Sequence, residues 1–308
     1  MIRLDAATFL LQWATGGLFF LWVTTRHRLV GLGYGWLMRG VFSVIAAGDL
    51  VAAAYTHVVV LREVAAAGVV ASAAGALVVS VVRRSAGVAA QHADIERKRD
   101  RVAAMVGAGA AAVVDDGPGT THLVMRDEFG REVRDRGPEV VGGHEFPPVL
   151  DLVAPLIGLA GVVAAAVDAG GNHVLAVARL VVGALFLGAV TDAMLLGHWY
   201  LVQPGLTRKP IGELNTWLLR LWPVEVALLL IPTGMIQAIQ GRVSDGWQGN
   251  LTWFWVACAV FTGLLAGATR IVLRERFYSA VMAATGMLYL AILTAFGTDL
   301  VARMILAP

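Results

Sequence analysis

Apolar residues occur in long, nearly uninterrupted runs rather than in the alternating patterns of half-buried elements. Eight runs are found, at about residues 8–25, 37–60, 64–82, 149–168, 174–202, 214–239, 250–271 and 278–303. A helix needs about 20 apolar residues to cross the hydrocarbon core of a bilayer. The pattern therefore predicts an all-α fold, a polytopic integral membrane helical bundle of about eight transmembrane helices.

One long polar stretch divides the chain into three parts. Residues 1–82 hold the first three predicted spans, residues 83–147 form an insert, and residues 148–308 hold the other five. Within the insert, the charged run from Gln91 to Val106 predicts a helical extension of the third span. Thr121–Arg126 and Arg131–Val133 flank a turn and predict a β-hairpin.

The cations are distributed unevenly between the two ends of the predicted spans. One end collects Arg26, Arg28, Arg39, Arg83, Arg84, Arg208, Lys209, Arg270, Arg274 and Arg276, whereas the other has Arg3, Arg62, Arg242 and Arg303. Cytoplasmic loops of membrane proteins carry the excess of Lys and Arg. The asymmetry predicts a cytoplasmic insert and both termini outside the cytoplasm.

Composition supports a membrane protein and excludes several classes of site. Hydrophobic residues make up 58% and charged residues 15% of the 308 positions, and the mean hydropathy is +0.72. No lysine lies in an apolar run, which excludes a retinal Schiff base. The single cysteine, Cys258, excludes an internal disulfide and an iron–sulfur cluster.

The same composition indicates the membrane in which the protein is found and the partners to expect. The preference for Ala, Val, Gly and Arg over Lys indicates a GC-rich genome, so we expect a multi-pass protein of a bacterial inner (plasma) membrane. The net charge of +2 gives no reason to expect nucleic acid as a partner. The expected partners are the lipid bilayer and other membrane-protein subunits.

Three acidic residues lie inside predicted spans: Asp49, Asp192 and Glu225. Counted along their runs, each lies roughly 15–16 Å from the cytoplasmic end, near mid-membrane. Buried intramembrane acids usually mark a pathway, a pairing or a site. We expect a proton relay in which Asp192 and Glu225 face each other. The alternative is that each acid is a structural tie to a hydroxyl, a carbonyl or an arginine.

Two ion pairs are candidates for such structural ties. Arg220 precedes Glu225 by five residues and is the expected partner of that acid. Arg179 and Asp299 are expected to pair near the non-cytoplasmic ends of the fifth and eighth runs. Each pair would join helices rather than catalyse a reaction.

The run His198-Trp199-Tyr200 near a predicted cytoplasmic helix end is the candidate cofactor site. Histidine can ligate a haem b, and the aromatic residues can form the wall of a quinone pocket. His57 lies near the opposite face, so His57 and His198 are not expected to share a haem iron. The alternative assigns Trp199 and Tyr200 to the aromatic belt at the membrane surface. No metal site is predicted.

Pro223 and Pro232 flank Glu225 within the predicted sixth span, where prolines kink helices. Broken helices beside an acid are typical of transporters. Three functions are therefore compatible with the sequence. The leading one is a membrane subunit of an energy-transducing or quinone-linked redox complex. The others are a proton-coupled small-molecule transporter and a structural or assembly factor without an active site. Whether the chain is an enzyme stays open.

Overall fold

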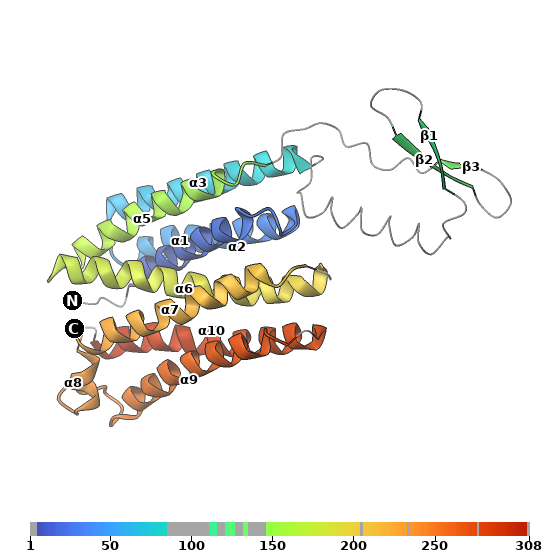
Figure 1. The fold of residues 1–308 in the computed structure, drawn as a ribbon. Helices are drawn as coiled ribbons and strands as arrows, with labels where there is room; N and C mark the ends of the chain where they lie inside the picture. Colours follow the sequence, from blue (N-terminus) through green and yellow to red (C-terminus); the bar gives the residue numbers. More distant parts are fainter. Residues whose placement is uncertain are drawn as a thin grey trace.

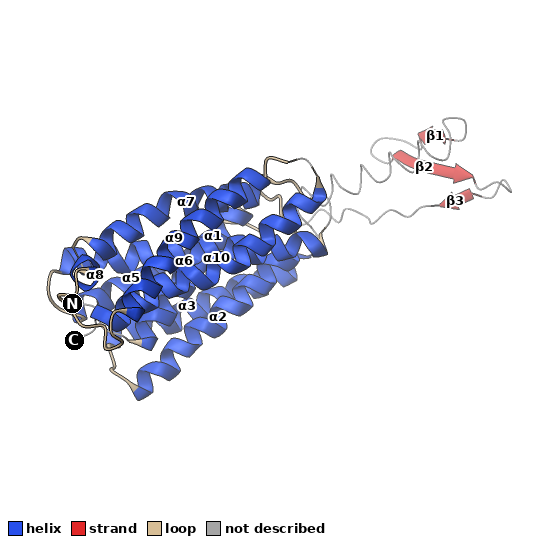
Figure 2. Ribbon diagram, turned by 90° about the horizontal axis from the view of Figure 1, so that it is seen from below, coloured by secondary structure: helices blue, strands red, loops and turns tan. Residues whose placement is uncertain are grey.

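The computed structural model describes residues 5–84, three short strands between 111 and 134, and residues 146–306 apart from 204–205, 233 and 276. Long helices dominate this part of the chain and run side by side along one axis (Figures 1 and 2). They are α1 (Ala6–Thr25), α2 (Leu32–Tyr55), α3 (Val60–Val82), α5 (Leu150–Asp168), α6 (His173–Val202), α7 (Lys209–Leu230), α9 (Asn250–Val272) and α10 (Tyr278–Leu306).

Seven of these helices are long and apolar enough to cross a membrane, judged by length and composition. The exception is α7, which holds Lys209, Glu213, Arg220 and Glu225 within its 22 residues. A helix with four charges is a poor span in isolation, because each charge is costly in hydrocarbon. The structure nevertheless packs α7 against α6 and α9.

Consecutive long helices run in opposite directions, so the bundle has two distinct ends (Figure 1). Both termini and the short helix α8 (Met235–Ile239) lie at one end, called here the termini end. The last residue of α3 and the first residue of α5 lie at the other, called the insert end. The location of both termini on one side follows from this alternation.

Between α3 and α5 the structure describes three short strands, β1 (Ala111–Asp115), β2 (Thr121–Arg126) and β3 (Glu132–Arg134). They form an antiparallel sheet in the order β1-β2-β3, with Val124 opposite Ala112 on one side and Arg134 on the other. The turns lie outside the described residues, and the β-hairpin expected at 121–133 stays a prediction. The helical extension expected at 91–106 lies outside the described residues.

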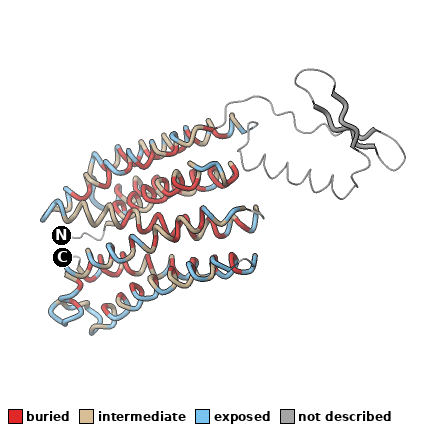
Figure 3. Tube along the Cα trace, viewed as in Figure 1, coloured by how far each residue is buried: buried red, intermediate tan, exposed pale blue. Residues whose placement is uncertain are grey.

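Two groups of helices make up the bundle. The first group contains α1, α2, α3 and α5; the second contains α7, α9 and α10; and α6 packs against helices of both. Buried residues face inward between the helices, and exposed residues face outward (Figure 3). The outward face carries large apolar side chains such as Val44, Phe261 and Leu264. Such a surface suits hydrocarbon rather than water.

The contact between α1 and α6 holds the two groups together at close range. A methyl group added at Gly188 would lie 2.2 Å from the carbonyl carbon of Gly16, and one added at Gly16 would lie 1.7 Å from the carbonyl oxygen of Ala184. The two backbones therefore pack directly against each other. Small residues allow this approach, which is a common way for membrane helices to associate.

Several predicted boundaries were wrong. The second span begins at Leu32 and ends at Tyr55, whereas the run of apolar residues continues to residue 60. The predicted span 214–239 is in fact α7, which ends at Leu230, followed by a turn and α8. Pro232 lies in that turn rather than inside a helix. Pro223 lies inside α7, which continues through it without a break.

Candidate functional site

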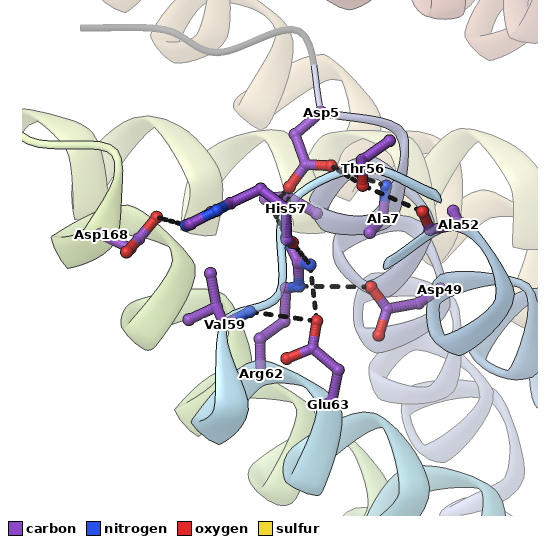
Figure 4. Close-up of polar contacts among 11 residues, drawn as sticks. Asp5, Ala7, Asp49, Ala52, Thr56, His57, Val59, Arg62, Glu63 and Asp168 are labelled. Atoms are coloured by element: carbon purple, nitrogen blue, oxygen red, sulfur yellow. Dashed lines mark hydrogen bonds and ion pairs between the residues drawn. The ribbon is translucent and has the colours of Figure 1, made fainter. Parts of the chain in front are cut away.

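Arg62, at the start of α3, is the centre of a charged cluster at the termini end (Figure 4). Its side chain is fully buried. One terminal nitrogen donates to Asp5 and to Thr8, the latter at 2.9 Å. The other donates to Glu63 at 2.6 Å and to the carbonyl of His57 at 2.7 Å. Arg62 thus joins the start of α1, the α2–α3 turn and α3.

Asp49 lies beside Arg62 but makes a weaker contact than the other acids do. Its Oδ1 is 3.5 Å from Nε of Arg62, and both side chains have no exposed surface. Neither carboxylate oxygen of Asp49 has a hydrogen-bond partner among the described residues. The cluster therefore contains three acids around one arginine, one of them unsatisfied. Asp49 is thus an ion-pair partner of Arg62, and its expected part in a proton relay stays a prediction.

Two residues at the edge of this cluster lie closer to solvent. His57 Nε2 is 3.2 Å from Asp168 Oδ2, and this contact links the α2–α3 turn to the end of α5 (Figure 4).

Burial by itself raises the pKa of Asp5, but the hydrogen bond from Thr8 and the charge of Arg62 outweigh it, so the pKa of Asp5 is lowered. Asp5 is thus held in its ionised form.

A second group of polar residues, buried except for the half-buried Arg179, lies where the two helix groups meet, and we call it the junction cluster. It consists of Gln12 on α1, Arg179 on α6, Glu225 on α7, and Asp299 and Arg303 on α10. Arg303 Nε donates to Asp299 at 2.8 Å, and its Nη2 donates to the amide oxygen of Gln12. Glu225 lies within electrostatic range of Asp299, Arg179 and Arg303.

The orientation of the Gln12 amide follows from its partner. Arg303 has only donors, so the amide must present its oxygen to Arg303. Its nitrogen then points away, toward Gly183 on α6, and has no partner among the described residues. Arg179 Nε and Glu225 Oε2 also lack partners there. The junction cluster therefore has two free donors and one free acceptor in a buried place.

Asp192 belongs to neither cluster. It is fully buried on α6, and the Tyr34 hydroxyl donates to its Oδ1 at 3.4 Å, while Oδ2 has no partner among the described residues. Asp192 lies ten residues, about 15 Å, from the insert end of α6. The charged groups that act on Glu225 do not include Asp192.

The three acids therefore do not lie at one depth, contrary to the sequence-based expectation. Asp49 lies six residues, about 9 Å, from the termini end of α2. Glu225 lies five residues, about 8 Å, from the termini end of α7. The expected depths of Asp49 and Glu225 were wrong because their helices begin earlier than the apolar runs, at Leu32 and Lys209. Asp192 lies at the depth expected from its run. Asp192 and Glu225 do not face each other.

The expected partners of Glu225 and Arg179 also differ from those found. Arg220 is exposed, because five residues along a helix turn a side chain to a different face, so it is not the partner of Glu225. Asp299 is paired with Arg303 of its own helix rather than with Arg179. Arg179 is close enough to act on Asp299 and Glu225 electrostatically, and its side chain is only half-buried.

His198, Trp199 and Tyr200 point in different directions and do not line one pocket. His198 is exposed, with Nδ1 3.4 Å from the hydroxyl of Tyr289 on α10. The Trp199 indole donates to Gln203 at 3.1 Å. Tyr200 is buried, and its hydroxyl donates to the carbonyl of Thr207 at 2.5 Å. Consecutive helical residues do not face one another, which explains the divergence.

The insert end contains an ion pair that sequence reasoning missed. Arg39 on α2 donates from Nε and Nη2 to the two carboxylate oxygens of Asp151 on α5. Thr25 of α1 donates to the same carboxylate, and the Arg39 guanidinium stacks over Phe146. Asp151 lies at the start of an apolar run, which could have indicated a buried acid in need of a partner. The sequence pattern placed Arg39 only among the cations at the cytoplasmic ends of the predicted spans.

Comparisons with known proteins return no similar protein: the chain matches no protein-family model, no curated protein and no solved structure. Within the described ranges, no group of three or more His, Cys, Asp or Glu side chains is arranged to hold a metal ion. The two charged clusters are therefore the candidate sites on geometry alone.

Proposed function

We propose that the protein is a proton-coupled membrane transporter for small molecules, with Glu225 as the group that takes up and releases the coupled proton. The observation that carries the proposal is the environment of Glu225. Its side chain is 2% exposed and lies within electrostatic range of a second carboxylate, Asp299, and of two arginines, Arg179 and Arg303. A buried acid in such surroundings is a candidate for a change of protonation during function.

The position of the junction cluster supports transport over the other functions. Gln12 comes from the first helix group, whereas Glu225, Asp299 and Arg303 come from the second. Transporters commonly place their sites between two groups of helices that move relative to each other. Pro223, two residues before Glu225, removes one backbone hydrogen bond from α7 and gives that helix a place to bend.

A subunit of an energy-transducing or quinone-linked redox complex is the second candidate. It would use Glu225, Asp192 and Asp49 as proton-relay groups, but these acids occupy three separate places. The divergence of His198, Trp199 and Tyr200 removes the common wall that a quinone or haem b pocket needs. Transport is therefore preferred. The excess of arginine at the insert end supports a cytoplasmic insert in the inner membrane of a bacterium.

Proton-driven accumulation in proteoliposomes tests the proposal. Vesicles containing the purified full chain would be given a pool of metabolites and an inward proton gradient, and their contents would be identified by mass spectrometry. We expect one chemical class to accumulate, and the accumulation to disappear with a protonophore and with Glu225→Gln. Glu213→Gln, which changes a partly exposed acid of the same helix, is the matched control and is expected to keep activity.

Three results would contradict the proposal of proton-coupled transport. Accumulation that persists without a proton gradient would remove the coupling. Absence of any accumulated compound, together with a haem or quinone absorption band in oxidised and reduced purified protein, would favour the redox subunit. Absence of both would favour a structural or assembly factor.

A further inference from the structure

We propose that the junction cluster binds a small monocarboxylate anion between Arg179 and the amide nitrogen of Gln12, and that the anion binds when Glu225 carries a proton. This inference rests on the proposed transport function and names the class of its substrate. It starts from the two free donors of the cluster and from its charge balance.

The free donors define the chemistry of the ligand. Gln12 is fully buried, its oxygen is used by Arg303, and its nitrogen has two hydrogens without an acceptor among the described residues. Arg179 Nε is a second donor without an acceptor there. Buried donors of this kind cost free energy unless a ligand or water satisfies them. A carboxylate offers two oxygens to two N–H donors, and hydrogen bonds to its charge are strong.

The geometry puts the two donors on one side of α6. Arg179 and Gly183 are four residues apart, so they occupy the same face of that helix. The Gln12 nitrogen lies 2.3 Å from where a methyl group at Gly183 would be. The lack of a side chain at Gly183 thus makes room for the amide one helical turn along α6 from Arg179. The half-buried state of Arg179 gives the site an opening that the other members lack.

The charge balance provides the coupling. With all four ionisable members charged, Arg179 and Arg303 offset Asp299 and Glu225, and the net charge is zero. Protonation of Glu225 leaves a net charge of +1, which a monovalent anion neutralises. The helices that pack beside α7 add no other charge at this end: α1 and α8 have none, the only charged residue of α9 is Arg270 at the insert end, and Asp192 of α6 lies toward the insert end. His173, the first residue of α6, is exposed.

Binding of proton and anion must then be reciprocal. An anion between Arg179 and Gln12 favours the protonated form of Glu225, and a proton on Glu225 favours the anion by the same factor. One proton and one monocarboxylate would move together without net charge. Electroneutral movement of an acid and its proton is the transport mode that this cluster supports.

Pyruvate binding to the full chain in lipid nanodiscs, measured by calorimetry across a pH series, tests the inference. We expect the affinity to increase as the pH falls, by up to about tenfold per pH unit where Glu225 titrates, which is the limit for one linked proton. Pyruvamide has the same shape without the charge and is expected not to bind. Chloride is expected not to compete because a single atom does not offer two oxygens to two separate donors, and sulfate because its second negative charge exceeds the net charge of +1 that the protonated cluster carries.

Two variants separate the proposal from loss of folding. Glu225→Gln imitates the protonated acid, and we expect pyruvate to bind with an affinity that no longer depends on pH, which a misfolded protein could not show. Arg179→Gln is expected to abolish binding, whereas Arg220→Gln, which changes an exposed arginine of α7, is expected to leave it unchanged.

Opposite outcomes have distinct meanings. Pyruvate that binds equally at all pH values, or equally to Arg179→Gln, would overturn the inference. Competition by chloride or sulfate would show a general anion site and would overturn the monocarboxylate assignment. If vesicles accumulate a different chemical class of compound, driven by protons and lost with Glu225→Gln, the proposed transport function stands and the monocarboxylate substrate is wrong. If pyruvate binds with proton linkage but is never accumulated, the binding site stands and the proposed transport function is wrong.

Discussion

Arg39 on α2 and Asp151 on α5 form a two-pronged ion pair, with N–O distances of 2.7 and 2.9 Å, while both side chains are nearly inaccessible. The pair holds the two helices at the insert end, where α5 enters the bundle. It lies on the opposite side of the molecule from the Arg62 cluster. Two buried charged ties therefore fix the first helix group at its two ends.

The Arg39–Asp151 pair predicts a strong single-mutant effect and a weak double-mutant effect. Asp151→Asn leaves a buried guanidinium without its counter-charge, which typically costs about 3–5 kcal/mol. We expect a much lower temperature of unfolding in detergent for Asp151→Asn and for Arg39→Met. The double variant Arg39→Met with Asp151→Leu should recover most of the loss, because no unpaired charge remains. A double variant as unstable as either single one would contradict this explanation.

Asp49→Asn should destabilise the protein less than Asp151→Asn does. Asp49 accepts no hydrogen bond from any described residue and is 3.5 Å from Arg62, whereas Asp151 accepts bonds from Arg39 and Thr25. Arg62 also keeps Asp5 and Glu63 when Asp49 is neutral. Thermal unfolding of the two variants in the same detergent provides the comparison. Equal losses would show that Asp49 has partners that its geometry does not indicate.

Arg62→Met should unfold more readily at neutral pH and regain stability in acid. The change leaves Asp5, Asp49 and Glu63 without their shared cation, so their charged forms become unfavourable. Lower pH protonates the acids and relieves this cost. The difference in unfolding temperature from the unsubstituted chain should therefore shrink as the pH falls. A difference that stays constant with pH would mean that Arg62 acts through packing alone.

The close approach of α1 and α6 predicts a contrast between two glycines. Gly188→Ala adds a methyl group 2.2 Å from the backbone of Gly16, and neither helix has a side chain that can move aside. Gly267→Ala on α9 meets nothing within 4 Å. We expect a low yield of folded Gly188→Ala and normal or slightly increased stability for Gly267→Ala, since alanine favours helix by about 1 kcal/mol. Similar behaviour of the two would contradict the backbone-to-backbone packing.

The loop between α8 and α9 should lose its order in strong acid. Hydrogen bonds from the backbone of Gly249, and further ones from Trp247 and Thr252, lower the pKa of Asp245 to about 2. The ionised form of Asp245 therefore stabilises the loop at pH values above the pKa that this acid has in the unfolded chain. This stabilisation is lost as the pH falls through the lower pKa that Asp245 has in the folded protein. The protection factors of the Gly249 and Thr252 amides, which compare the measured exchange rate with the intrinsic rate at the same pH, should therefore fall between about pH 4 and pH 2. In Asp245→Ala these protection factors should be low at every pH.

Membrane orientation can be tested with two introduced cysteines in a Cys258→Ala background. Ser244 is exposed at the termini end and Glu275 is exposed at the insert end. We expect an impermeant maleimide to label Ser244→Cys in intact cells and Glu275→Cys only after the cells are opened. The reverse pattern would invert the predicted topology.

The sequence by itself determined the membrane class, the alternation of long helices and the common side of the two termini. Long apolar runs suffice for these, because hydrocarbon requires every backbone polar group to be satisfied within a helix. The sequence also singled out Asp49, Asp192 and Glu225, because acids in apolar runs are conspicuous.

Only the tertiary structure decided which of these acids lie together. Helix ends depend on turns and capping, so Asp49 and Glu225 lie near the termini end, whereas Asp192 lies toward the insert end with Tyr34. The rotation of each helix decides which side chains face a neighbour, so Glu225 is buried within electrostatic range of Asp299 and Arg303 on α10, while Arg220 is exposed. Gln12 was inconspicuous in the sequence, and its importance arises only from Arg303, 291 positions away along the chain.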